Sequence, residues 1–321
     1  MWTKSHSIIT KEQIWKLKTS AVLVLLLGFN LFGMAQNSSE NNSNENKYVF
    51  YSVFVNYLPD GFDFPGIGFV NMARGNHSTA YIGLVNYADS LSGTQIGLIN
   101  TVKQLPSGSQ IGLVNTALSG ENKAAQIGWV NANRSNLTGV QVGLINANSG
   151  KVTGLQLGII NYSDTVSGVP LGLISVVRKG GYRALEVSLS EIAPVNVSFK
   201  LGVEKLYTSF NLAYNPNAEQ KIMYGVGVGS IIPLRNHFFF NPEISNMIST
   251  KKHSAQQFLR AVPAFGFQYR RMNIIAGPSV SYFHSGKDRI TNQPFMKIFG
   301  HEFDSRNKIV VGVQAGIRVV L

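Results

Sequence analysis

The sequence predicts an all-β protein in two parts: a β-solenoid with a repeat of about 15 residues, then an eight-stranded antiparallel barrel of the membrane type. Three observations predict it. A motif of the form Ile-Gly-Leu-Val-Asn recurs eight times between Gly66 and Ser175, and its successive glycines are 14 to 16 positions apart. From Tyr182 onward, eight long segments alternate apolar and polar residues. An apolar stretch near the N-terminus indicates export.

Residues 1–35 are predicted to be a signal peptide, because four lysines precede the apolar run 21–32 and the small-residue triplet 33–35 suits cleavage. The apolar run is shorter than a membrane-spanning helix requires. Residues 36–47 (QNSSENNSNENK) are polar and of low complexity, so they are predicted to be a disordered tether. The chain has no cysteine, which excludes disulfides and thiol chemistry.

The tandem repeat region is predicted to span residues 48–177, with one short strand per unit. Strict alternation in the fifth unit would place Ile127, Trp129 and Asn131 on one face, and Gln126 and Gly128 on the other. Stacking of identical units then predicts an aliphatic column inside, an Asn column at a corner and a Gly column along one face. The predicted structural ladder consists of Asn71, Asn86, Asn100, Asn115, Asn131, Asn146 and Asn161, with Gly68, Gly83, Gly97, Gly112, Gly128, Gly143, Gly158 and Gly172.

A second arrangement of the repeats stays open at this stage. Units that run alternately up and down would merge with the C-terminal strands into one barrel of about 16 strands. Such a barrel predicts two alternating kinds of connection, and strands of roughly 9–11 residues. The repeats have one kind of connection and a shorter strand signal, which favours the solenoid. The segment 48–57 is predicted to cap the first solenoid coil or to begin a barrel.

Residues 178–321 are predicted to form the antiparallel barrel. In the segment 194–204, apolar residues alternate with polar or small ones, and the segment 307–321 repeats the pattern. A soluble sandwich also alternates, but unbroken apolar faces of this length are typical of strands that face lipid. The interior of an eight-stranded barrel is filled by side chains. The predicted lumen charges, which ought to pair there, are Glu186, Lys200, Glu204 and Arg318.

The chain is basic, with a net charge of +12 and a pI near 9.8. Its cations are dispersed and gather at predicted turns of the barrel, such as Arg178-Lys179 and Arg270-Arg271. Cations in these places suit anionic lipid headgroups, or simply solvated turns. We therefore expect outer-membrane lipid as a partner and no nucleic acid.

The repeats resemble the tandem Gln-x-Gly-Leu-x-Asn units of exported surface-repeat proteins of Gram-negative bacteria. The C-terminal part looks like an outer-membrane β-barrel of the kind abundant in Bacteroidota. The resemblance implies a location in the outer membrane, at the cell surface. The triplets 89–91 and 164–166 resemble the Asp-Ser/Thr-apolar O-glycosylation site of the same bacterial group, which makes Ser90 and Thr165 candidate acceptors in inter-strand turns.

No constellation in the sequence predicts catalysis, a metal or a cofactor. The stretch 301–304 (HEFD) lacks the helical context and second His of a zinc-protease motif. The glycines of 224–229 (YGVGVG) precede no helix that could bind phosphate. The sequence therefore predicts a non-enzymatic, outer-membrane-anchored surface protein with a structural or adhesion-like interaction role and an unidentified ligand or protein partner. The alternative is a porin-like channel formed by the single larger barrel.

Overall fold

The computed structural model describes residues 49–251, 254–286, 290 and 293–321. The predicted signal peptide (1–35) and tether (36–47) lie outside the described residues. The described part of the chain is all β, in two separate sheets of 12 and 10 strands. No helix within the described residues is long and apolar enough to cross a membrane.

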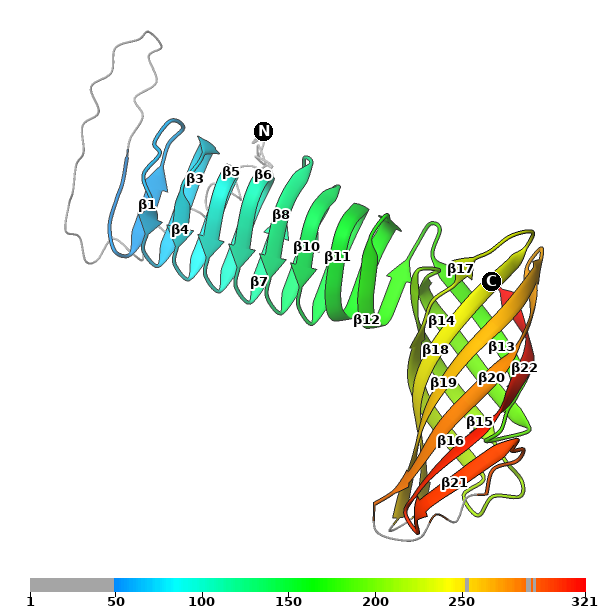
Figure 1. The fold of residues 1–321 in the computed structure, drawn as a ribbon. Helices are drawn as coiled ribbons and strands as arrows, with labels where there is room; N and C mark the ends of the chain where they lie inside the picture. Colours follow the sequence, from blue (N-terminus) through cyan, green and yellow to red (C-terminus); the bar gives the residue numbers. More distant parts are fainter. Residues whose placement is uncertain (1–48, 252–253, 287–289, 291–292) are drawn as a thin grey trace, which may run out of the picture.

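The first sheet is a parallel β-solenoid, as the repeat predicts (Figure 1). Its strands pair in register with their equivalents one coil away; Gln126, for example, pairs with both Gln110 and Gln141. The strands are β1 (Val55–Leu58), β2 (Gly66–Ile67), β3 (Val70–His77), β4 (Ala80–Ile82), β5 (Val85–Ile96), β6 (Ile99–Ile111), β7 (Val114–Ala117), β8 (Asn122–Ile127), β9 (Val130–Asn133), β10 (Leu137–Val142), β11 (Ile145–Val166) and β12 (Val169–Val177).

The side-chain directions within a coil differ from the prediction. A bend at Gly128 and Trp129 separates β8, which ends at Ile127, from β9, which begins at Val130. The bend resets the alternation, so that Asn131 is buried while Ile127 and Trp129 are exposed. The predicted aliphatic column is therefore outside the solenoid, and the glycines lie at its corner. The interior beside the corner contains columns of Asn and Gln, backed by small and apolar side chains such as Ala88, Leu91 and Val102.

The repeat begins one coil earlier than the eight recognisable units. In β1, Val55 and Asn56 pair in parallel register with Val70 and Asn71. Asn56 is fully buried and donates a hydrogen bond from Nδ2 to Asn71 Oδ1 over 2.7 Å. The segment predicted as a cap is thus the first rung of the solenoid, with Val53 in place of the corner glycine.

The second sheet closes into an eight-stranded antiparallel barrel, because its last strand pairs with its first. The barrel strands are β13 (Tyr182–Leu189), β14 (Val195–Val203), β15 (Leu206–Tyr214), β16 (Ile222–Gly229), β18 (Phe238–Lys251), β19 (Ser254–Tyr269), β20 (Met272–Ser285) and β22 (Asn307–Val320), with the extra strands β17 (Ile232–Pro233) on β18 and β21 (Phe299–Asp304) on β22. Because the repeats pair only in parallel and in their own sheet, the single barrel of about 16 strands is excluded.

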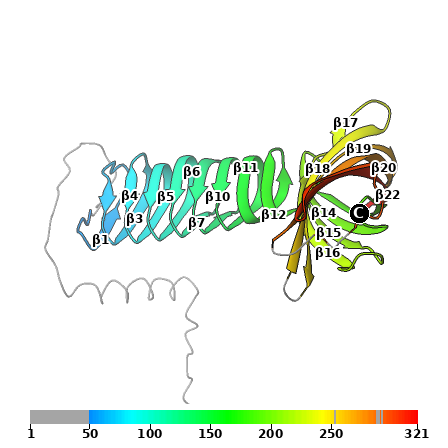
Figure 2. The ribbon, with the colours of Figure 1, turned by 60° about the horizontal axis from the view of Figure 1, so that its bottom comes forward.

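The solenoid projects sideways from the barrel as a rod, which Figures 1 and 2 show from two directions. Its last strand, β12, packs against the outside of β14 and β15. The junction lies near the end of the barrel that carries the turn 204–205 and the C-terminus.

Candidate functional site

Two ladders of amide side chains run along the inside of the rod. From Asn71 to Asn146, each Asn of the predicted ladder donates from Nδ2 to the Oδ1 of its equivalent in the next coil; the distance is 2.8 Å from Asn115 to Asn131 and 2.8 Å from Asn131 to Asn146. The same Nδ2 of Asn115 donates to the carbonyl oxygen of Ile127 at 2.9 Å. The ladder includes all seven predicted Asn residues and ends on the hydroxyl of Ser175. Both protons of each such amide are therefore used, as a buried polar group requires.

The glutamines form a second ladder, which donates in the opposite direction along the rod. Nε2 of Gln126 donates to Gln110 Oε1 at 2.7 Å, and Nε2 of Gln141 donates to Gln126 Oε1 at 2.7 Å. The sequence analysis did not identify this ladder, although the Gln that starts five of the eight units is its visible signal. The ladders fix the register of the coils and so align everything that the coils display outside.

The corner glycines are required by close backbone approach. A Cβ added to Gly128 would lie 2.1 Å from the carbonyl oxygen of Gly112 and 2.6 Å from Asn115 Nδ2. The corresponding glycines of the neighbouring coils meet the same obstacles. The backbone at this corner therefore carries no side chain, and the side chains before and after each glycine project outward on either side of it.

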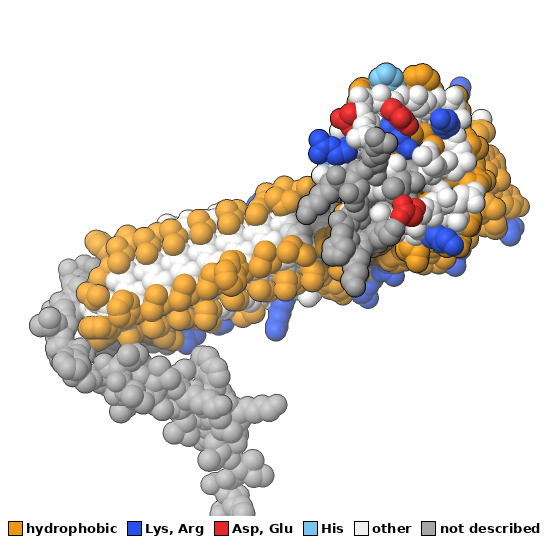
Figure 3. Space-filling model, turned by 90° about the horizontal axis from the view of Figure 1, so that it is seen from below, with side chains coloured by type: hydrophobic (Ala, Val, Ile, Leu, Met, Phe, Trp, Pro, Cys, Tyr) orange, Lys and Arg blue, Asp and Glu red, His pale blue; other side chains and the backbone are white. Residues whose placement is uncertain are grey.

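These side chains form an exposed band along the rod, here called the apolar strip. Figure 3 shows its first two rows and the pale backbone between them. The strip consists of a first row of Ile67, Ile82, Ile96, Ile111, Ile127, Val142, Leu157 and Leu171, a second row of Phe69, Leu84, Leu98, Leu113, Trp129, Leu144, Ile159 and Leu173, and a third row of Val70, Val85, Ile99, Val114, Val130, Ile145, Ile160 and Ile174. Most of these side chains are about 40–60% exposed, and Trp129, at 63%, is the most exposed of them.

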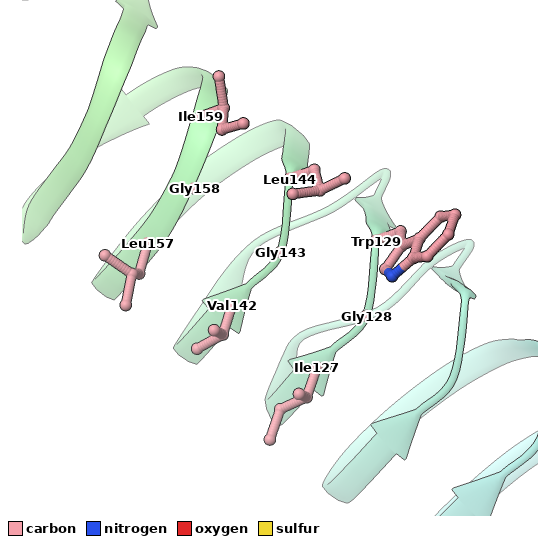
Figure 4. A pocket seen from close by; sticks show the side chains of 9 residues that line it. All are labelled: Ile127, Gly128, Trp129, Val142, Gly143, Leu144, Leu157, Gly158 and Ile159. Carbon is pink, nitrogen blue, oxygen red and sulfur yellow. The ribbon is translucent and has the colours of Figure 1, made fainter.

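Between the first two rows lies an open groove with the glycine backbone as its floor (Figure 4). Where it is best formed, its walls are Ile127 and Val142 on one side and Trp129 and Leu144 on the other. The lining is almost wholly apolar, so the groove offers no polar group that would select a sugar or a nucleotide. Its chemistry suits hydrocarbon.

The charges of the rod lie away from the apolar strip. Every charged residue of 66–175 stands outside the segments that run from the Gln position to the Asn position of each unit. Asp89 illustrates their role: its Oδ1 is 2.7 Å from Lys103 Nζ and 2.9 Å from Tyr87 Oη. Burial raises the pKa of the Asp89 carboxyl, but the hydrogen bonds from Lys103 and Tyr87 outweigh it and hold the pKa below its ordinary value.

The barrel lumen near the rod is closed by a network of charged and aromatic side chains. Arg318 Nε donates to Glu186 Oε2 at 2.8 Å, and Lys200 Nζ is 3.3 Å from the same oxygen. Lys200 also pairs with Glu243, which accepts a hydrogen bond from the Tyr207 hydroxyl at 2.8 Å. Glu186, Lys200 and Arg318 are each 1% exposed. The structure thus places three of the four predicted lumen charges together and adds Glu243 to them.

Glu204 is the exception among the predicted lumen charges. It lies exposed in the turn between β14 and β15, because β14 ends at Val203 and alternation stops with the strand.

A second network lies in the other half of the lumen, beside a buried apolar cluster that includes Met247, Phe258 and Phe283. Glu191, in the connection 190–194 after β13, folds inward and is fully buried. Arg260 donates two hydrogen bonds to its carboxylate, from Nε to Oε1 at 2.9 Å and from Nη2 to Oε2 at 3.2 Å. The hydroxyls of Ser279 and Ser281 donate to the same carboxylate. Sequence analysis missed this site, because Glu191 follows its strand, and its partners are distant along the chain.

The outer wall of the barrel is apolar. The large hydrophobic side chains exposed on it include Leu185, Val187, Phe199, Leu212, Tyr224, Val226, Ile244, Leu259, Phe265, Phe267, Tyr269, Met272, Ile274, Val280, Ile317 and Val319. Leu201 and Val203 also face outward but are only 9% exposed, because β12 of the rod covers them. There the Thr208 hydroxyl donates to the corner carbonyl of Gly172 at 2.7 Å. The apolar strip therefore meets the apolar wall at this junction.

The remaining predicted residues lie outside these features. Ser90 lies within β5 and Thr165 within β11, both half-buried, so the prediction that they stand in inter-strand turns was wrong. Ser90 pairs with Asn76 and Gln104 in the neighbouring coils, and the register shifts directly after it, between Ser90 and Ser92. His301 lies on the exposed strand β21. Within the described residues, no group of three or more His, Asp or Glu side chains is placed to hold a metal ion.

The comparisons with known proteins add a structural likeness. No protein-family model matches the sequence. No curated protein matches it. Among solved structures the chain is similar to the crystal structure of Neisserial surface protein A (NspA), with 12% sequence identity, a TM-score of 0.27, and coverage of 44% of this chain and 98% of that chain. The description of the barrel therefore rests on the strand pairing of this chain itself.

Proposed function

We propose that this chain is an outer-membrane protein whose barrel serves as an anchor and whose rod serves as a structural or interaction module, without catalysis. The observation that carries the proposal is the apolar outside of the barrel: large apolar side chains cover its outer wall, while its inside contains two networks of buried charges beside an apolar cluster. A water-soluble barrel or sandwich turns polar side chains outward instead. Closed barrels satisfy all their backbone hydrogen bonds, as a membrane-spanning structure must.

The filled lumen supports an anchor rather than a channel. Arg318 and Lys200 occupy the lumen near the rod, and Arg260 with Glu191 occupies the other half. The carboxylates at the centre of both networks are engaged by Lys, Arg, Ser or Tyr, which favours a structural role for them over acid–base catalysis.

The interaction role rests on the rod. It displays the same side chains at regular spacing along its length, which is typical of repeat proteins that bind extended partners. We infer an adhesion-like or scaffold role for it, with lipid as one partner and no nucleic acid.

A charge on the outer wall tests the anchor. Val280 lies in the middle of β20 and is 41% exposed. In a lipid-facing barrel, Val280→Arg should cost roughly 2–4 kcal/mol and lower the amount of folded protein in the outer-membrane fraction. Gln257→Arg is the matched control, because Gln257 is polar, exposed and near the end of β19.

Heat-modified migration on gels and membrane fractionation measure the outcome. If Val280→Arg is as abundant and as folded as the control, or if the parent stays monodisperse without detergent, the barrel is not a membrane anchor. Steady conductance of the purified parent in planar bilayers would show an open channel and contradict the sealed lumen.

A further inference from the structure

We propose that the apolar strip is a lipid-binding surface, and that the rod lies flat on the leaflet that surrounds the end of the barrel to which it is attached. The inference rests on the proposed function, since it needs the barrel to span a bilayer. It identifies the partner of the rod as the headgroup and upper acyl region of phospholipid.

The apolar strip is large enough that we expect another molecule to cover it. Eight coils spaced about 4.8 Å apart make a band roughly 35 Å long and three side chains wide. Soluble monomers rarely expose a continuous apolar patch of more than a few hundred Å². The strip contains no charged residue along this whole length.

The direction of the strip points to the bilayer. Figure 3 views the molecule from the side toward which the barrel extends away from the junction, and the apolar strip faces the viewer along the rod. The rod projects sideways from the barrel (Figure 1), so a membrane that surrounds the barrel would lie beneath the strip.

The position of the strip along the barrel axis also agrees with a place at the membrane surface. Gly172, at the corner of the last coil, accepts its hydrogen bond from Thr208, near the beginning of β15. Beyond this contact the outer wall continues with Phe199 and Leu212, which are 37% and 52% exposed. The strip thus joins the wall near the edge of its apolar surface, where hydrocarbon gives way to headgroups.

Charge is distributed as a surface-bound rod requires. The cations at the junction end of the barrel include Arg178, Lys179, Lys205, Arg270 and Arg271, which stand in the connections before β13, after β14 and after β19 and suit adjoining headgroups. The carboxylates and lysines of the rod itself lie away from the strip. This is the pattern of an interfacial amphipathic element, with an apolar face toward lipid and a polar face toward water.

The lengths of the barrel connections identify the leaflet. At the junction end the connections are 204–205, 230–237 and 270–271, whereas the long connection between Ser285 and Asn307 is at the other end. The short β18–β19 hairpin also lies at that other end. Outer-membrane barrels place short turns in the periplasm and long loops outside. We therefore place the rod on the periplasmic leaflet, where a scaffold role fits and adhesion to another cell does not.

Trp129 is a natural probe of the contact. The sequence has three tryptophans, at 2, 15 and 129, so Trp2→Phe and Trp15→Phe leave Trp129 as the sole emitter. Trp129 lies in the second row of the strip, and indole rings favour the membrane interface. The full chain with these two changes is reconstituted into phosphatidylethanolamine–phosphatidylglycerol vesicles, with or without phospholipids brominated on the upper part of the acyl chain.

We expect blue-shifted emission, at least twofold quenching by the brominated lipid and weak quenching by aqueous iodide. Leu98→Glu with Leu144→Glu places charges in the strip and should abolish quenching by the lipid. Thr138→Glu with Thr153→Glu is the matched control, because both threonines are exposed on the rod away from the strip. The control should be quenched like the parent.

The outcomes separate this inference from the anchor. Barrel insertion is followed independently by heat-modified migration. If the barrel inserts but Trp129 is quenched by iodide and not by brominated lipid, the lipid contact is refuted and the anchor stands. If the barrel does not insert, the anchor itself fails. If Trp129 is shielded from iodide in native membranes yet unaffected by brominated lipid, a protein covers the strip, and the lipid assignment is wrong.

Discussion

Replacing Asn115 by Asp perturbs the buried amide ladder at a single rung. Asn115 is fully buried, and its Nδ2 donates to Asn131 Oδ1 at 2.8 Å and to the Ile127 carbonyl oxygen at 2.9 Å, while its Oδ1 accepts from Asn100 at 2.9 Å. An Asp carboxylate can still accept the bond from Asn100. It has no proton to donate, so one of its oxygens faces the two acceptor oxygens that Asn115 Nδ2 had bound.

The magnitude follows from these contacts. Asn131 Oδ1 is left without a donor, which costs about 1–3 kcal/mol, whereas the Ile127 carbonyl oxygen still accepts from the Gly112 N–H at 3.0 Å. Burial also raises the pKa of the new carboxyl group. The loss is therefore complete at pH values above that raised pKa. It becomes smaller as the pH falls through it, because a protonated Asp can donate one of the missing bonds.

Hydrogen–deuterium exchange of the coils around β7 is the assay, because the solenoid opens locally and independently of the barrel. Amides of these coils should exchange at least tenfold faster in the variant at neutral pH, and less so in acid, after correction for intrinsic rates. Asn136→Asp is the matched control. Asn136 is exposed, and its Oδ1 accepts from the Lys151 N–H at 3.0 Å, which a carboxylate can also do. Equal protection in both variants would refute the ladder as a source of stability.

Three further changes have expected outcomes. Gly128→Ala should destabilise the rod by about 1–3 kcal/mol, since the new Cβ would lie 2.1 Å from a backbone oxygen; local exchange measures it. Arg318→Met leaves Glu186 buried with its main partner removed and should destabilise the barrel by about 3–5 kcal/mol, measured by urea unfolding in detergent. Lys103→Met should raise the pKa of the Asp89 carboxyl, because it removes a hydrogen bond to the charged form; carboxyl carbon NMR follows the titration.

Each of these three substitutions has a control variant. Gly286→Ala should be harmless, because nothing lies within 4 Å of the added Cβ. Arg318→Met combined with Glu186→Gln should recover part of the lost stability, since no uncompensated charge remains. Lys123→Met, on an exposed lysine of another coil, should leave the titration of Asp89 unchanged. Failure of any contrast would show that the named contact does not produce the effect.

Alternation in the sequence was sufficient for the barrel, because each strand turns its side chains inward and outward in strict succession. The segments predicted at 194–204 and 307–321 are found as β14 and β22. The same rule placed Glu186 in the lumen but failed for Glu204, where the strand had already ended. It could not find Glu191, which lies beyond its strand and is held by groups 69 to 90 residues away along the chain.

The local periodicity of the sequence predicted short stacked units followed by a cylinder with an apolar outside. The direction of the side chains within a unit could be read only from the three-dimensional structure. The bend at Gly128 interrupts the alternation, and the carbonyl oxygen of Gly112 in the coil before it leaves no room there for a side chain. The tertiary structure also decided that the apolar strip joins the wall of the barrel, because the contact between Thr208 and Gly172 links two sheets that no local pattern relates.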